Sequence, residues 1–86
     1  MATWRELIAA AMNESGETFA DMVSTTLTEY DMDKSFYDGF GGADGEPFTL
    51  WTTNRVYFPV CYDGSEWVGS VPRNPCNERT SHHGGG

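Results

Sequence analysis

The stretch from Phe48 to Pro72 constrains the fold most, because it carries two turn signals between runs of β-branched and aromatic residues. Asp63-Gly64 strongly favours a two-residue type I′ hairpin turn, and Thr53-Asn54 forms a second short connection. The runs around these turns predict strands over residues 48–52, 55–62 and 65–71. Because short connections join antiparallel neighbours, the stretch predicts a three-stranded antiparallel meander.

Alternation assigns the side chains of the middle predicted strand to two faces. One face carries Val56, Phe58, Val60 and Tyr62, and the other carries Tyr57, Pro59 and Cys61. We expect Tyr57, with Trp51 of the preceding strand, to face solvent. Proline has no backbone N–H for a sheet ladder, so Pro59 predicts a bulge or a locally opened pairing.

The N-terminal half has helical patterns instead. Thr3 and Glu6 form a capping box at the start of a predicted helix over residues 1–13. A weaker helix is predicted over residues 17–26, although its Ser-Thr-Thr run lowers helix propensity. Thr28 and Asp31 form a second capping box and start a further helix. Gly39 is the expected residue after its C-terminus.

These elements predict one α+β domain, in which two or three short N-terminal helices pack on one face of the three-stranded antiparallel β-meander. The chain has 86 residues, the length of one domain. We place the domain at residues 1–75. Residues 76–86 are polar, end in three glycines and predict a flexible C-terminal tail.

The charge is strongly negative, with 13 acidic and 5 basic residues and a net charge of −8. Such a chain is repelled by polyanions, which argues against direct contact with nucleic acid or an anionic membrane. There is no run of about 18 apolar residues and no signal-peptide pattern. Cys61 and Cys76 do not form a disulfide framework, so we expect a cytoplasmic protein, although a bond between them stays open.

The whole net charge lies between residues 14 and 46, where nine acids accompany a single cation, Lys34. Such a surface can serve solubility alone, or it can steer the protein towards a basic groove. Aromatic side chains between the acids can supply the apolar anchors of a binding site. The predicted partner-binding residues are Glu29, Asp31, Asp33, Asp38, Asp44 and Glu46, with the aromatic residues Tyr30, Tyr37 and Phe40.

No motif indicates catalysis, a cofactor or a metal. The two histidines, His82 and His83, stand in the predicted tail, where no rigid element orients a base beside a nucleophile. Their spacing from Cys76 matches no standard zinc pattern. The alternate Asp31 and Asp33 suggest a calcium loop, but the glycine and the terminal glutamate of such a loop are missing. We therefore expect a protein that is not an enzyme and that has no cofactor.

A short, acidic, single-domain chain without catalytic motifs resembles the small inhibitors carried by bacteriophages and mobile elements. These include anti-restriction and anti-CRISPR proteins, several of which are similar to DNA in their charge layout. The resemblance implies inhibition of a basic, nucleic-acid-processing protein in the host cytoplasm. The alternative is a small adaptor or regulatory subunit that docks through the face or edge of its sheet. Salt sensitivity separates the two, because only binding through the acids should weaken steeply with salt.

Overall fold

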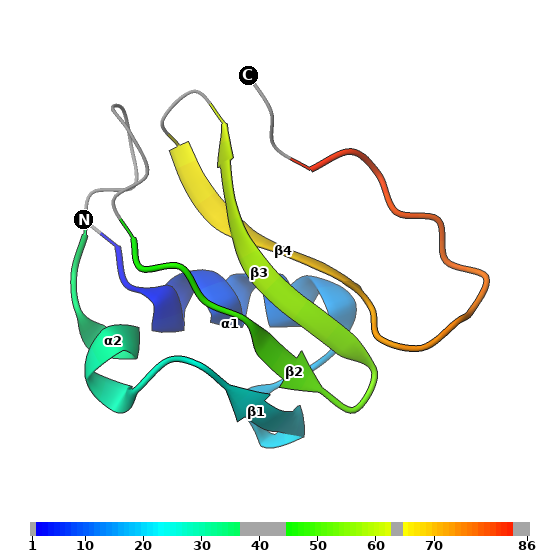
Figure 1. Ribbon diagram of the computed structural model, residues 1–86, viewed down its shortest axis with the longest axis horizontal. Coiled ribbons are helices and arrows are strands. Elements are labelled where there is room, and N and C mark those ends of the chain that lie inside the picture. The colour runs from blue at the N-terminus through cyan, green and yellow to red at the C-terminus, as the bar shows by residue number, and fades with distance from the viewer. Residues whose placement is uncertain (1, 37–44, 63–64, 84–86) are drawn as a thin grey trace.

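The computed structural model describes residues 2–36, 45–62 and 65–83 (Figure 1). The elements in chain order are α1 (Trp4–Ser15), the 3-10 helix η1 (Phe19–Asp21), β1 (Met22–Thr25), α2 (Glu29–Asp33), β2 (Leu50–Thr52), β3 (Arg55–Tyr62) and β4 (Ser65–Pro72). Within the described residues, the strands form one antiparallel sheet in the order β1-β2-β3-β4. Helix α1 lies behind this sheet in Figure 1. The predicted α+β class is therefore confirmed, with one more strand than expected.

Helix α1 begins as its sequence predicts. The Thr3 hydroxyl accepts a hydrogen bond from the Glu6 amide, and the Glu6 carboxylate accepts one from the Thr3 amide. Gly16 ends the helix in the left-handed conformation, with φ of 77°, which glycine adopts without steric cost. The buried stripe of the helix consists of Trp4, Ile8, Ala11 and Met12.

The predicted helix over residues 17–26 is wrong. Thr18 and Asp21 form a capping box, but the turn that they start stops after the three residues of η1. The chain then becomes strand β1, which pairs with β2 and contains a register shift between Met22 and Ser24. Hydroxyl and β-branched residues suit an extended edge strand better than a helix, and this preference accounts for the fourth strand.

Helix α2 starts at the predicted capping box of Thr28 and Asp31 but is shorter than expected. It ends at Asp33, and Lys34 is already extended. Phe36 then forms an antiparallel bridge with Ala2, with hydrogen bonds in both directions. The bridge ties the chain to the N-terminus and prevents the helix from continuing. The predicted C-terminal residue Gly39 lies outside the described residues.

The three predicted strands of the meander are confirmed, with small shifts at their ends. Thr53-Asn54 connects β2 to β3, as predicted, whereas the predicted turn at Asp63-Gly64 lies outside the described residues. The pairing of β3 with β4 runs without interruption from Arg55↔Pro72 to Tyr62↔Ser65. The bulge predicted at Pro59 is therefore wrong, because Pro59 pairs with Val68 in regular register.

The hydrogen-bonding pattern explains how Pro59 fits. The Arg73 amide donates to the Asn54 carbonyl, directly opposite it in the β3–β4 register. Hydrogen-bonded and non-bonded pairs alternate along an antiparallel ladder, so Pro59↔Val68 is a non-bonded pair. The nitrogen of Pro59 points towards β2, whose pairing with β3 covers only Val56 and Tyr57. The missing N–H therefore removes no ladder bond.

The core lies between α1 and the sheet. Trp4 is 1 % exposed and packs against Phe36 and Phe48, with ring centroids 4.7 Å and 4.8 Å away. Leu50 and Tyr57 face this core and are fully buried. The prediction that Tyr57 faces solvent is thus wrong, because α1 covers the face that carries it. Trp51 belongs to the opposite face and is partly exposed.

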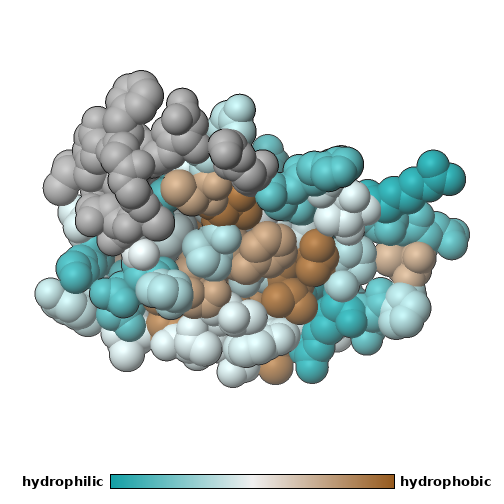
Figure 2. Space-filling view, turned by 45° about the horizontal axis from the view of Figure 1, so that its top comes forward, coloured by the Kyte–Doolittle hydropathy of each residue, from teal (hydrophilic) through white to brown (hydrophobic). Residues whose placement is uncertain are grey.

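That opposite side, the outer face, carries the other set of alternating side chains. Its members are Trp51, Val56, Phe58, Val60, Tyr62, Trp67 and Val71. Tyr62 is 51 % exposed and Trp67 is 37 % exposed. Figure 2 shows hydrophobic residues gathered across the middle of the molecule, with hydrophilic residues on either side. The C-terminal segment reaches this face through an edge-on contact of His83 with Phe58, at 5.4 Å between ring centroids.

Candidate functional site

The strongest candidate from the sequence is the acidic α2 surface, which we define as Glu29, Tyr30, Asp31, Asp33, Lys34 and Glu46. Five of the nine predicted binding residues lie in it: Glu29, Tyr30, Asp31, Asp33 and Glu46. The other four predicted residues, Tyr37, Asp38, Phe40 and Asp44, lie outside the described residues. Lys34 links α2 to Glu46 through a separation of 3.9 Å between Nζ and Oε1.

Asp31 has a structural role on this surface. Its carboxylate accepts a hydrogen bond of 3.0 Å from the Thr28 amide, and its own amide donates to the Thr28 hydroxyl over 3.1 Å. The backbone hydrogen bond is the main reason that the pKa of Asp31 is lowered. A carboxylate at the first turn also interacts favourably with the helix N-terminus. Replacing Asp31 would therefore disturb α2 itself, not only a binding surface.

Arg5 holds the other two carboxylates of α2. Its Nη2 lies 2.7 Å from Glu29 Oε2, and its Nε lies 2.7 Å from Asp33 Oδ1. The hydrogen bond from Arg5 lowers the pKa of Asp33. A guanidinium forks naturally between two carboxylates, so Arg5 fixes their separation and cancels part of their charge. Four carboxylates then face two cations, Arg5 and Lys34, and two negative charges remain in excess.

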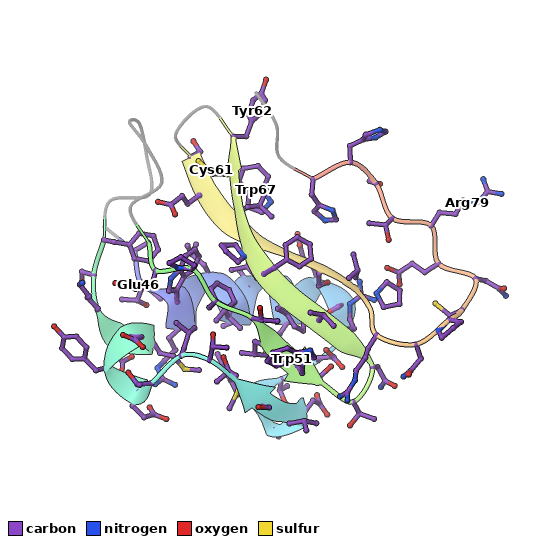
Figure 3. All side chains as sticks on the ribbon, viewed as in Figure 1. Glu46, Trp51, Cys61, Tyr62, Trp67 and Arg79 are labelled. Atoms are coloured by element: carbon purple, nitrogen blue, oxygen red, sulfur yellow. The ribbon has the colours of Figure 1, made fainter. Side chains whose placement is uncertain are left out.

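Tyr30 projects from the middle of this surface. Its side chain is 74 % exposed, although tyrosines generally bury most of their ring. A hollow of about 320 Å³ beside it is lined by Glu29, Tyr30, Asp33 and Lys34. Glu46, labelled in Figure 3, points from the chain before β2 towards the same side of the molecule. The arrangement is an exposed aromatic ring surrounded by fixed charges.

Two further acids of the 14–46 segment support the fold. Glu17 accepts a hydrogen bond of 2.6 Å from the Tyr57 hydroxyl, and its two oxygens accept bonds of 3.1 Å and 3.0 Å from Thr52 Oγ1. Asp21 caps η1 through the Thr18 amide. The Thr18–Asp21 spacing repeats the capping-box pattern, so the sequence did contain a signal for Asp21. Nothing local marks Glu17, whose partners lie 35 and 40 residues further along the chain.

Tyr57 makes the stability of the fold sensitive to alkaline pH. Burial, and then the hydrogen bond to Glu17, raises its pKa from 10.0 to about 12. Between these values the unfolded chain loses the tyrosine proton while the folded chain keeps it. We therefore expect the free energy of unfolding to fall as the pH rises from about 10 to about 12. Urea unfolding across this range should show a shallower fall for Tyr57→Phe, and equal slopes would contradict the assignment.

Neither a cluster of metal-ligating side chains nor a disulfide is present in the described part of the chain. No three histidine, cysteine, aspartate or glutamate side chains gather there in a way that could hold a metal ion. Cys61 and Cys76 are free thiols, which answers the open question of their pairing. None of the described helices is long and apolar enough to cross a membrane.

The C-terminal segment is held against the sheet at two places. Arg55 Nη1 lies 2.8 Å from Glu78 Oε1, and the hydrogen bond from Arg55 lowers the pKa of Glu78. His83 reaches Phe58 on the outer face, while Arg79, between these two points, projects away from the sheet (Figure 3). Sequence reasoning missed these contacts, because the composition of the segment suggests only coil.

The chain was compared with protein-family models, with curated proteins and with solved structures, and none of the three comparisons finds a match.

Proposed function

We propose that this protein is a non-enzymatic binding protein that inhibits a basic, nucleic-acid-processing partner by docking its acidic α2 surface onto it. The observation that carries the proposal is Tyr30, exposed over 74 % of its area among the carboxylates of Glu29 and Asp33. Tyrosine is enriched among the residues that dominate binding energies at protein interfaces. An exposed tyrosine ringed by acids suits a partner with an apolar pocket inside a basic surface.

The negative charge of the protein favours the approach of a basic partner. The net charge of −8 attracts a basic protein over distances near the Debye length, about 8–10 Å at physiological salt. Steering of this kind raises association rates more than it slows dissociation. Basic grooves of the required charge occur in proteins that bind nucleic acid, because they must neutralise phosphates. A protein that occupies such a groove would compete with the nucleic acid and inhibit its processing.

We expect the double variant Glu29→Gln/Asp33→Asn to bind this partner with an association rate lowered about tenfold at low salt, because steering is lost. Tyr30→Ala should raise the dissociation rate about tenfold, because the anchor is lost. Both variants leave the Thr28–Asp31 capping box intact. Affinity capture from host lysate with quantitative mass spectrometry identifies the partner, and surface plasmon resonance with the purified partner gives both rates.

The matched control is Glu78→Gln, a neutralisation on the C-terminal segment, which should change neither rate by more than about twofold. The purified partner should also lose its activity on nucleic acid when wild-type protein is added, and keep it with Tyr30→Ala. The proposal is wrong if the captured protein is not basic, or if the α2 variants bind and inhibit as the wild type does.

The outer face favours a second candidate function, an adaptor that docks through its sheet. Trp67 and Tyr62 are exposed there at 37 % and 51 %, and both project from the paired ends of β3 and β4 (Figure 3). Apolar docking of this kind depends little on salt. Loss of binding in Tyr62→Ala, with salt-independent affinity, would favour the adaptor over the inhibitor.

A further inference from the structure

Strand β4 is an edge of the sheet, and its backbone pattern can be assigned residue by residue. The Arg73–Asn54 hydrogen bond sets the alternation along the β3–β4 ladder. Trp67, Gly69 and Val71 bond to β3, while the N–H and C=O groups of Glu66, Val68 and Ser70 point away from β3. The Ser70 carbonyl accepts a hydrogen bond of 3.4 Å from Arg55 Nη2, so that among the described residues the edge is open at Glu66 and Val68. Pro72, which has no N–H, comes next. The edge therefore offers a short row of donors and acceptors for another strand.

A groove of about 500 Å³ runs along this edge. It is lined by Val68, Gly69 and Ser70 of β4, by Arg55 of β3, and by Ala11, Glu14 and Ser15 of α1. Glu78 and His83 of the C-terminal segment also line it. Residues of α1 and of the C-terminal segment therefore lie beside the strand, which distinguishes it from a bare sheet edge.

The usual protections of an edge strand are weak here. Natural sheets place charged side chains or prolines on exposed edges to prevent pairing. The one charged residue of β4, Glu66, instead turns inwards, and its two oxygens each lie 3.2 Å from the Gly45 amide. The remaining side chains of the strand up to Val71 are uncharged.

The charges and apolar groups in the groove define what would fit. Glu14 lies on the α1 side and, within the described chain, has no hydrogen bond or ion pair. Glu78 is paired with Arg55, so Glu14 is the carboxylate still available for an incoming cation. On the outer-face side, Trp67 offers part of its ring. An added strand alternates its side chains between these two sides.

We propose that the β4 edge binds an extended peptide segment of a protein partner as an additional strand, with basic side chains towards Glu14 alternating with apolar side chains towards Trp67. Backbone hydrogen bonds to Glu66 and Val68 supply affinity, and the two rows of side chains supply specificity. The site is independent of the proposed function. It lies at the β4 end of the sheet, whereas α2 lies at the other side of the molecule (Figure 1).

Amide hydrogen exchange tests the proposal with full-length protein and a synthetic capped peptide of alternating valine and lysine. The amides of Glu66 and Val68 should exchange at least about tenfold more slowly when peptide is added, because they become hydrogen-bonded. Those of Trp67, Gly69 and Val71, already bonded to β3, should change little. Absence of this alternating pattern at saturating peptide would overturn the proposal.

Three controls define the occupant. In one control peptide every valine backbone nitrogen is methylated, and in a second every lysine backbone nitrogen is methylated. One of the two peptides should lose binding and the other should keep it, because only alternate N–H groups of an added strand face β4. Equal binding of both would overturn the proposal. Glu14→Gln should weaken binding of the lysine peptide about threefold, the scale of one exposed ion pair, while Asn13→Ala, at the neighbouring exposed position of α1, should leave it unchanged. Edge protection that rises with protein concentration alone would identify a second copy as the occupant and overturn the peptide assignment.

Discussion

Replacing Trp4 with alanine is expected to lower the free energy of unfolding by about 3–5 kcal/mol, the usual cost of removing a large buried aromatic ring. The ring packs between Phe36 and Phe48, and its indole N–H donates a hydrogen bond of 3.0 Å to the Glu46 carbonyl. A domain of this size is stable by only about 5–10 kcal/mol. The loss is therefore about a third of the total stability or more, and urea unfolding followed by circular dichroism should show the transition midpoint fall in proportion.

Trp67→Ala is the matched control for this prediction, because it removes the same ring from the partly exposed outer face. It should cost no more than about 1 kcal/mol, as surface substitutions usually do. Trp4→Phe should lie between the two, because it keeps much of the packing but leaves the Glu46 carbonyl without its donor. Equal losses for the alanine variants of Trp4 and Trp67 would show that the core is not where the structure places it.

Glu17→Ala is expected to lower the free energy of unfolding by about 2–3 kcal/mol, the scale of hydrogen bonds to a charged acceptor. Two fully buried side chains, Tyr57 and Thr52, donate to this carboxylate. Without it, both hydroxyls lose a charged acceptor, and the Tyr57 hydroxyl keeps only Ser15 Oγ as a hydrogen-bond partner. The same urea titration measures the loss.

Glu14→Ala is the control for Glu17→Ala, because it removes an equal charge from the same end of α1. Glu14 is exposed, so its loss should change stability by less than about 0.5 kcal/mol. A general effect of reduced charge repulsion would stabilise both variants equally. Stability unchanged or raised in Glu17→Ala would therefore contradict the structural role of this acid.

Local patterns in the sequence predicted local structure well. The capping boxes at Thr3 and Thr28 and the turn at Thr53-Asn54 depend on residues within a few positions of each other, and all three are confirmed. The helix predicted over residues 17–26 is wrong because the conformation of this segment depends on pairing with β2, whose residues lie 25 to 30 positions further along the chain. Tertiary pairing overrides a weak helix preference of this kind.

The candidate site also divides into contacts between neighbours in the chain, which the sequence could predict, and long-range contacts, which it could not. Four of the five described residues predicted to bind a partner lie together on α2 because they are neighbours in the chain, and their role in binding stays a prediction. The sequence could not show that Arg5 pairs with Glu29 and Asp33, since these contacts join residues 24 and 28 positions apart. Nor could composition separate Glu17, which holds Tyr57, from acids that face solvent. The β4 groove depends on tertiary packing of α1 and the C-terminal segment, and no local signal marks it.

The most direct test of the central claim is the salt dependence of binding between the wild-type protein and its captured, purified partner. If the acidic α2 surface binds a basic groove, the dissociation constant should rise steeply between low and physiological salt. The Glu29→Gln/Asp33→Asn variant should show a much shallower rise. A dissociation constant that stays the same across this range, and that is equal for wild type and variant, would contradict the account.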